Sequence, residues 1–327
     1  MKCKKITGLL MALVVLFGAL TGCASDGSNA DRKVVVGAAM PVFDDKWLSY
    51  LYDAMKDGAK DKNVDLKMVD AKNDSSKQLS QVEKFATEGV DVIVVCPVDT
   101  AAVKPMVNVA KQANIPIVIV NRIPPKDVMK DVDSYVGSES IKGGIIQMEE
   151  VAKILNNKGN VAIMTGQLGH EAQVKRTVGN KEVIQKHPDM QIILEGTAKW
   201  QRAEGIQLME NWLQSGKKID AVVANNDEMA IGAIKALKEA GKLDETVVAG
   251  VDGTPDALKY VKSGDLDVSV FQDPVGQGKG AIDTAVKLAK GEKLKDKMVW
   301  IPYELITKRN VQEFEERWDV YNKNKSN

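Results

Sequence analysis

Side chains suited to binding a small polar molecule occur in short polar segments along the chain. They comprise two indole rings, two carboxylates, two guanidinium groups and three amides, namely Asp45, Trp47, Asn121, Arg122, Arg176, Trp200, Asn226, Asp252 and Gln272. Indole rings offer flat apolar faces, carboxylates accept hydrogen bonds, guanidinium groups donate them, and amides do both. This combination suits a pyranose or cyclitol ring, which has apolar C–H faces and a rim of hydroxyls. Two acids set against two arginines further predict a ligand without net charge.

The sequence offers no arrangement typical of catalysis or of a metal centre. It contains two histidines, His170 and His187, which cannot form a cluster with metal-ligand spacing. It has no Gly-x-Ser-x-Gly elbow and no catalytic Cys/His pair, and Cys96 stands at the end of an apolar run. The glycines at 276, 278 and 280 lack the spacing of a dinucleotide-binding loop and favour close helix packing. We therefore expect no enzyme activity, no cofactor and no metal.

The elements that position these residues follow from an alternation of short Val/Ile-rich runs with longer amphipathic segments. This alternation predicts βαβ units and mostly parallel sheets. In the first half we expect strands at 33–39, 64–69, 91–96 and 116–120, with helices at 46–62, 76–88 and 101–113. In the second half we expect strands near 135 and at 159–165, 190–196, 219–224, 246–251 and 266–271, with helices at 142–155, 172–187, 201–214, 227–240 and 255–263. Helices at 276–290 and 310–321 complete the chain.

The nine polar and aromatic residues come after, or close, predicted strands in both halves of the chain. Ligands of open α/β sheets bind beyond the carboxyl ends of the strands. We therefore predict two doubly wound α/β domains with the ligand in the cleft between them.

Some of these polar residues have a plain structural alternative. Asp227 is predicted to cap the helix that it begins rather than to bind a ligand, and Asp44 is predicted to be a solvated loop residue. Trp200 could fill a core, but its polar neighbours favour ligand contact. Arg122 could pair with a nearby acid, and His170 by itself is more typical of a structural or surface histidine.

The N-terminus has the features of an export signal. Lys2, Lys4 and Lys5 precede an uncharged run, 6–20, that is too short for a membrane-spanning helix. The sequence Leu20-Thr-Gly-Cys23 that closes the run is the lipobox pattern of bacterial lipoprotein precursors. We predict a signal peptide over 1–22, a lipid on the thiol of Cys23 and a flexible tether over 23–32. The alternative is a cleaved secretory signal with an incidental cysteine.

Charge and cysteine content narrow the possible partners. The 327-residue chain carries 45 basic and 45 acidic residues, and loss of the three signal-peptide lysines changes the formal charge from 0 to −3. This balance, without a Lys/Arg cluster, argues against nucleic acid as a partner. Because Cys3 leaves with the signal and Cys23 carries lipid, Cys96 has no cysteine with which to pair.

Three stretches resemble a known family. They are Ala224-Asn-Asn-Asp-Glu-Met-Ala-Ile-Gly-Ala, Val251-Asp-Gly-Thr-Pro-Asp, and Gln112-Ala-Asn-Ile-Pro-Ile-Val before Asn121-Arg122. Over 33–302 the chain is similar to periplasmic sugar-binding proteins of the ribose and galactose/glucose class. The resemblance implies two Rossmann-like domains joined by three hinge crossings, closing on the sugar and presenting a surface to an ABC importer permease. The domains would comprise 33–134 plus 273–301 and 135–272 plus 302–321.

The family's ligand positions coincide with the nine residues above, and they add one more. The galactose/glucose type has a ligand histidine six residues before the arginine of its first second-domain helix, which corresponds to His170 before Arg176. That type also carries a calcium loop, but nothing in 153–160 supplies one, so the prediction of no metal stands.

The resemblance favours a cyclitol over ribose as the ligand. Ribose binders usually have Asp-Arg after the fourth strand and a phenylalanine pair near the first strand, whereas this chain has Asn121-Arg122 and Asp45/Trp47. The combination of Asn-Arg with Met40-Pro-Val-Phe-Asp-Asp is more similar to binders of inositol. We expect a monomeric, extracytoplasmic, lipid-anchored binder of myo-inositol. The alternative ligand is a sugar of the galactose/glucose or ribose type, and the alternative partner is a membrane signalling protein. A transcription regulator on the same fold would need a DNA-binding segment where the signal peptide lies.

Overall fold

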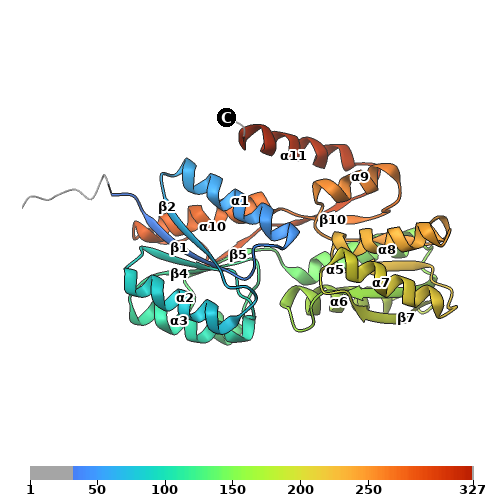
Figure 1. Ribbon diagram of the computed structural model, residues 1–327, viewed down its shortest axis with the longest axis horizontal. Helices are drawn as coiled ribbons and strands as arrows, with labels where there is room; N and C mark the ends of the chain where they lie inside the picture. Colours follow the sequence, from blue (N-terminus) through green and yellow to red (C-terminus); the bar gives the residue numbers. More distant parts are fainter. Residues whose placement is uncertain (1–31, 326–327) are drawn as a thin grey trace, which may run out of the picture. The chain divides into compact units, whose positions relative to one another are not determined.

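The first of two parallel sheets is built by residues 35–137 and a returning strand near the C-terminus (Figure 1). The computed structural model describes residues 32–325, of which the part from Lys33 onward forms one compact unit. The strand order is β11-β5-β4-β3-β1-β2, and all neighbours are parallel. The strands are β1 (Val35–Met40), β2 (Asp65–Asp70), β3 (Val92–Val95), β4 (Ile117–Val120), β5 (Ser134–Gly137) and β11 (Met298–Trp300).

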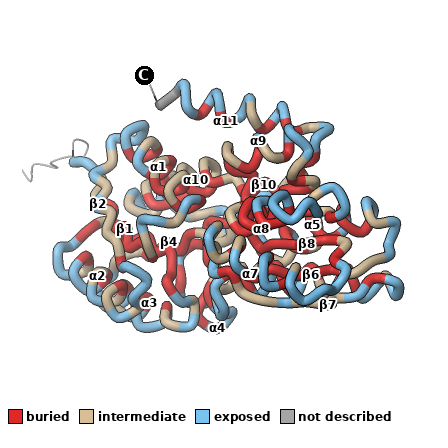
Figure 2. The backbone as a smooth tube through the Cα atoms, turned by 45° about the vertical axis from the view of Figure 1, so that its right-hand side comes forward, coloured by how far each residue is buried: buried red, intermediate tan, exposed pale blue. Residues whose placement is uncertain are grey.

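Helices cover both faces of this first sheet because its strands are apolar on both sides. Alternate residues of β1 separate into two cores: Val36, Ala38 and Met40 pack in one, and Ala39 packs in the other. The first core contains α1 (Lys46–Asp61) and α10 (Pro274–Ala289), and the second contains α2 (Ser75–Glu88) and α3 (Val103–Gln112). The short α4 (Lys126–Met129) precedes β5. Figure 2 shows buried residues in strands such as β1 and β4 and in parts of the helices, whereas the edge strands β2 and β7 are mostly intermediate or exposed.

The second sheet has the order β7-β6-β8-β9 and is also parallel. Its strands are β6 (Gly159–Thr165), β7 (Met190–Thr197), β8 (Ala221–Ala224) and β9 (Val247–Ala249). Single β-bridges connect this sheet to β10 (Ser269–Gln272), which pairs antiparallel with β12 (Tyr303–Ile306). One side is covered by α5 (Ser140–Ile154) and α6 (Glu171–Ile184), and the other by α7 (Arg202–Gln214), α8 (Asp227–Glu239), α9 (Pro255–Ser263) and α11 (Val311–Lys325).

The chain passes between the two sheets three times. The first crossing, 138–139, links β5 to α5; the second, at Asp273, links β10 to α10; the third, 301–302, links β11 to β12. Each sheet with its helices is called a lobe below. Two doubly wound lobes joined by three crossings confirm the predicted fold class.

Most predicted elements agree with the structure to within a few residues, and the differences lie at the crossings. The strand near 135 was expected to open the second half, but β5 pairs with β4 and β11 in the first sheet. The strands β11 and β12 were not predicted; β11 pairs with β5 and β12 pairs with β10. The predicted close packing at Gly278 is confirmed, because a Cβ atom there would lie 2.6 Å from the carbonyl oxygen of Leu51 on α1.

The predicted signal peptide and the lipidated Cys23 lie outside the described residues. Within 32–325, no helix has the length and apolar character needed to span a membrane. The predicted domain limits stay a prediction.

Candidate functional site

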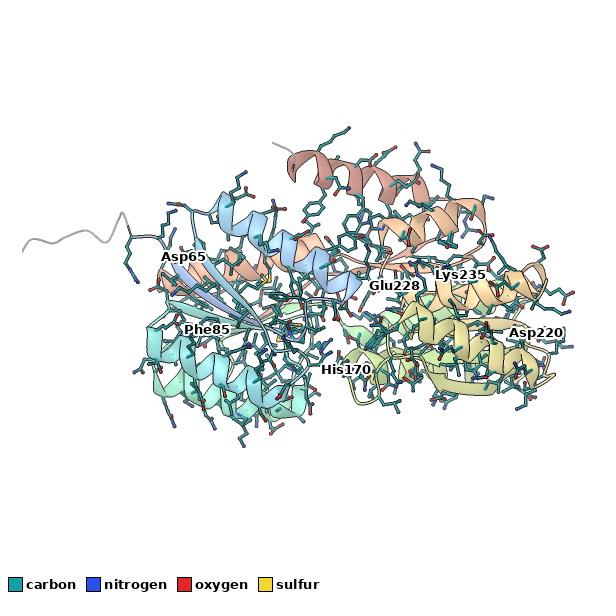
Figure 3. The ribbon with its side chains drawn as sticks, in the orientation of Figure 1. Asp65, Phe85, His170, Asp220, Glu228 and Lys235 are labelled. Atoms are coloured by element: carbon teal, nitrogen blue, oxygen red, sulfur yellow. The ribbon has the colours of Figure 1, made fainter. Side chains whose placement is uncertain are left out.

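All ten residues predicted to bind the ligand line one cavity between the two lobes. The first lobe supplies Asp45, Trp47, Asn121 and Arg122, and the second supplies His170, Arg176, Trp200, Asn226, Asp252 and Gln272. Leu48 and Ala172 complete the lining and were not predicted as site residues. Figure 3 shows His170 where the elements of the second lobe face those of the first.

The start of α1, which follows β1, places an acid and an indole at the cavity. Asp45 caps α1, because its Oδ1 accepts from the backbone N–H of Leu48 at 2.9 Å. Burial raises the pKa of Asp45. Trp47, the second residue of α1, is 6% exposed, and its indole N–H donates to the carbonyl oxygen of Gln272 at 3.0 Å. This hydrogen bond joins the first lobe to the end of β10.

The pair after β4 is held by main-chain and side-chain partners. Asn121 adopts φ of 68°, and its Nδ2 donates to Oε1 of Gln277 at 3.1 Å. The buried Arg122 donates through Nη1 to the carbonyl oxygens of Pro97 and Val98, at 2.8 and 3.2 Å. The guanidinium group is therefore held by backbone oxygens and not by an ion pair with a nearby acid, which was the alternative prediction for Arg122.

Arg176 forms the densest set of contacts in the cavity. Its Nη1 donates to the carbonyl oxygen of Asn225 at 2.6 Å, and its Nη2 donates to Gln272 Oε1 at 2.6 Å and to Tyr303 Oη at 3.1 Å. The Nε atom is buried without a hydrogen-bond partner among the described residues. Gln272 and Tyr303 adjoin the second and third crossings, so this one side chain contacts the strand residues next to two crossings.

Asp252 faces Arg176 across the floor of the site. Its Oδ1 lies 3.6 Å from Arg176 Nη1, and the residue is 4% exposed. Burial raises the pKa of Asp252, and the neighbouring guanidinium acts against this rise. A carboxyl group so placed can accept hydrogen bonds from a ligand hydroxyl in a region shielded from water.

His170 and Trp200 form a stacked pair. Their ring centroids lie 6.3 Å apart with an interplanar angle of 27°, and Trp200 Nε1 donates to His170 Nδ1 at 3.1 Å. Burial lowers the pKa of His170 to about 4, so the imidazole is neutral at pH 7. Because Nδ1 accepts, the ring proton is on Nε2, which is then a donor. The Trp200 ring also lies against Gly166, where a Cβ atom would overlap it.

The predicted cap of α8 is wrong by one residue. Asn226 is the cap, because its Oδ1 accepts from Met229 N at 3.1 Å. Asp227 is fully buried and accepts instead from Gly253 N at 2.7 Å and from Ser269 Oγ at 2.8 Å. Asp227 thus supports the loop that carries Asp252, and burial raises its pKa to about 6. Asp44 is exposed, as expected.

Three cavity residues have a backbone conformation that L-residues seldom adopt. Asn121 and Trp200 both have φ of 68°, and Asp252 has φ of 135°. Such conformations persist only where the surroundings impose them, and they cluster at functional sites.

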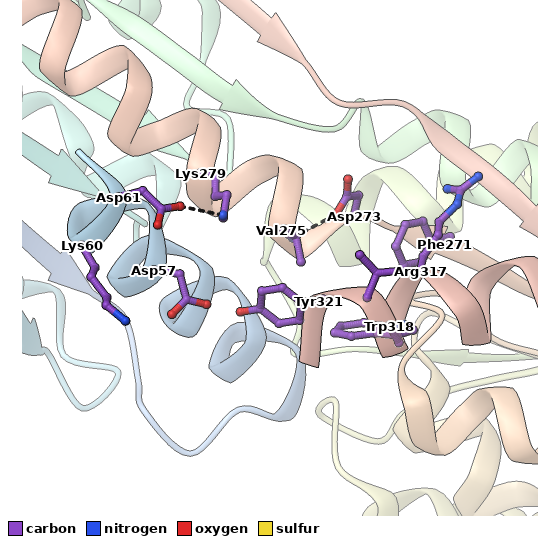
Figure 4. A pocket seen from close by; sticks show the side chains of 11 residues that line it. Asp57, Lys60, Asp61, Phe271, Asp273, Val275, Lys279, Arg317, Trp318 and Tyr321 are labelled. Atoms are coloured by element: carbon purple, nitrogen blue, oxygen red, sulfur yellow. Dashed lines mark hydrogen bonds and ion pairs between the residues drawn. The ribbon is translucent and has the colours of Figure 1, made fainter. Parts of the chain in front are cut away.

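A larger cavity lies elsewhere, between α1, α10 and α11 (Figure 4). It measures about 460 Å³, against about 50 Å³ for the cavity of the ten residues. Several of its charged groups have protein partners: Lys279 pairs with Asp61 at 2.9 Å, and Asp273 caps α10. Arg317 pairs with Glu304. We place the site in the smaller cavity, where polar groups from both lobes converge.

The cavity is equipped to bind and not to react. Its acids, guanidinium groups and amides converge without a nucleophile beside a base. The Cys96 thiol is fully buried and burial raises its pKa to about 11, so it is not a nucleophile at neutral pH. Two lobes that share one polar cavity and are joined by three crossings define a two-lobed binding protein.

Comparison with known proteins identifies the family. The model of the periplasmic binding protein domain matches residues 36–293, and the chain belongs to this family. It is 47% identical to the putative rhizopine-binding protein of Rhizobium meliloti, over 88% of this chain and 94% of that one. It is 32% identical to the ribose import binding protein of Escherichia coli, over 87% and 95%.

A solved structure supports the same assignment. An ABC transporter solute-binding protein from Bacillus halodurans with bound myo-inositol is 51% identical, with a TM-score of 0.83 over 87% of this chain and 98% of that one. The predicted family is confirmed. The members are binding proteins, so this chain is a binding protein and not an enzyme, and membership indicates a place outside the cytoplasm.

The supporting residues that the sequence did not reveal are Asn225, Gln277 and Tyr303. Asn225 follows β8 directly, and its position next to Asn226 was the available signal. Gln277 and Tyr303 reach the site from α10 and β12, far from it in sequence, and no local pattern marks them.

Proposed function

We propose that this chain is the lipid-anchored solute-binding protein of an ABC importer and that its ligand is myo-inositol. The observation that carries the proposal is the cavity itself, in which two indoles, two acids, two guanidinium groups and amides from both lobes converge. The similarity to the Bacillus halodurans protein, whose structure holds myo-inositol, supports this ligand among neutral polyols.

The geometry suggests how each group would act. Trp47 and Trp200 would lie against the C–H faces of the ring, while Asp45 and Asp252 would accept from hydroxyls. Arg176 Nε, which has no partner among the described residues, and Nε2 of His170 would donate to ligand oxygens. Each hydrogen bond to a charged group contributes about 1.5–3 kcal/mol.

Isothermal titration calorimetry of the compact unit, Lys33–Asn327, tests the ligand. We expect one-to-one binding of myo-inositol that is tighter than that of D-galactose, D-glucose or D-ribose. Tighter binding of a hexose or of ribose would show that this sugar, and not myo-inositol, is the ligand, while the class of function would remain that of a solute-binding protein. Absence of heat with all four would refute the assignment to neutral sugars and cyclitols.

The anchor and the importer need separate tests. The lipid predicts that full-length protein fractionates with membranes and that Cys23→Ser releases it; membrane association unchanged by Cys23→Ser would refute it. For the importer, deletion of its permease should abolish uptake of radiolabelled myo-inositol. Uptake that persists, together with co-purification of a membrane sensor, would favour the signalling alternative.

A further inference from the structure

Gln277 is a fully buried residue of α10 that does not line the cavity, yet it is bonded to a residue that does. Its Oε1 accepts from Asn121 Nδ2 at 3.1 Å, and its Nε2 donates to Ser138 Oγ at 3.0 Å. Ser138 belongs to the first crossing between the lobes and is 1% exposed. One amide therefore connects a cavity residue to a hinge segment.

The contact matters because the Asn121 side chain has two possible orientations. Rotation of its amide by half a turn exchanges the oxygen acceptor with the nitrogen donor and so changes which ligand hydroxyl it can satisfy. With Nδ2 bonded to Gln277, Oδ1 is kept as an acceptor. The backbone of Asn121 is held as well, since Tyr135 Oη donates to its carbonyl oxygen at 2.8 Å and to that of Ser138 at 3.3 Å.

We propose that Gln277 is a positioning residue for ligand binding, which sets the amide orientation of Asn121 and ties it to the first hinge crossing at Ser138. The role rests on the proposed function, since it needs a ligand in the cavity. Gln277 acts through Asn121, without touching the ligand. The crossing cannot move relative to α10 without disturbing this chain of hydrogen bonds.

The test is a double-mutant cycle measured by calorimetry with myo-inositol. Gln277→Leu leaves the Asn121 N–H group unpaired, and we expect the Kd to rise about tenfold or more. Gln277→Glu retains an oxygen within reach of Asn121 and of the Ser138 hydroxyl, and we expect it to restore the Kd to within about threefold of the wild type. In an Asn121→Ala background, Gln277→Leu should have no further effect.

A structural role without positioning would give a different pattern. Gln277→Leu would then raise the Kd equally with and without Asn121→Ala, or not at all, and either result overturns the proposal. Gln147→Leu is the matched control, because Gln147 is equally buried and bonded through its amide to Ala224 O and Asn180 in the second lobe. We expect it to lower stability and to leave the Kd within about twofold of the wild type.

Two further arms keep the test decisive. If Gln277→Leu does not fold, Gln277→Met, which is unbranched, takes its place in the same cycle. If the wild type binds none of the four sugars and cyclitols, the proposed function fails but the cycle is still measurable by urea unfolding. Non-additive midpoints for Asn121→Ala and Gln277→Leu would then support the coupling, and additive midpoints would overturn it.

Discussion

Replacement of Asp252 by Asn tests the electrostatics of the site, because it removes one charge while keeping the side-chain shape. The carboxylate oxygen lies 3.6 Å from Arg176 Nη1. At an effective dielectric constant of about 20, two unit charges at that distance attract by about 4–5 kcal/mol before the cost of burying them. Breaking a buried pair costs about 3–5 kcal/mol when the remaining charge is left uncompensated.

The structure reduces that cost for Asp252→Asn. Arg176 keeps its hydrogen bonds to Asn225, Gln272 and Tyr303, so we expect the free energy of unfolding to fall by only about 2 kcal/mol. A ligand hydroxyl would lose a charged acceptor and gain a neutral one. The binding free energy should then weaken by about 1–1.5 kcal/mol, which is roughly a tenfold rise in Kd. Burial raises the pKa of Asp252, so both differences should shrink on acidification as the wild-type carboxyl becomes neutral.

Calorimetry with myo-inositol and urea unfolding, each at several pH values, measure these effects. Asp267→Asn is the matched control, because Asp267 accepts from Val248 N at 2.8 Å and lies outside the cavity. It should leave the Kd unchanged. A Kd for Asp252→Asn within twofold of the wild type would refute the role of Asp252 as a ligand acceptor. Global unfolding of the variant would show that Asp252 is chiefly structural.

Three further predictions concern the aromatic pair and the buried acid. Trp200→Ala should abolish detectable binding of myo-inositol, because the half-buried ring lines the cavity. The far-ultraviolet circular dichroism should stay that of the wild type. Loss of the fold would show instead that Trp200 is a core residue. The pKa of His170 is lowered to about 4, so the folded ring binds a proton less readily than the ring of the unfolded chain. The contribution of His170 to stability is therefore complete above about pH 6.5 and is lost as the pH falls toward 4. Protonation of the folded ring also removes Nδ1 as the acceptor for Trp200. Relative to His170→Gln, the wild type should therefore lose stability below about pH 6 and should lose affinity only as the pH approaches about 4. Identical pH profiles would contradict this. The pKa of Asp227 is raised to about 6, so its neutral form stabilises the fold at low pH. This contribution, on the order of 2–3 kcal/mol, is lost as the pH rises from about 4 to above 6. In urea unfolding, Asp227→Asn cannot ionise and should lack that loss, whereas parallel plots of unfolding free energy against pH for the two proteins would refute the assignment.

The ends of the strands were predictable because their signals are local. Runs of Val and Ile stop where polar residues begin, and parallel strands bring their carboxyl ends to a common edge. This is why Asn121, Asp252 and Gln272, which are far apart in sequence, could be assigned to one site. His170 depended on the family resemblance, because a lone histidine carries no local signal.

Other features depended on contacts between distant segments. Whether β5 joins the first or the second sheet is decided by its pairing with β4 and β11, and the last of these comes about 160 residues later. The cap of α8 differs from the prediction by one residue, because capping depends on backbone dihedral angles that Asn226 and Asp227 do not reveal by type. The backbone partners of Arg122 were equally hidden.

The sequence alone predicted the fold class and the residue types of the cavity, because hydrophobic periodicity and strand-end chemistry are written in consecutive residues. The tertiary structure decided how those residues are held. The hydrogen bonds of Arg176 to Gln272 and Tyr303, and of Gln277 to Asn121 and Ser138, join residues separated by 96 to 156 positions. Such pairings arise only because the crossings return the chain to each lobe, since short-range patterns carry no information about which distant side chains will meet.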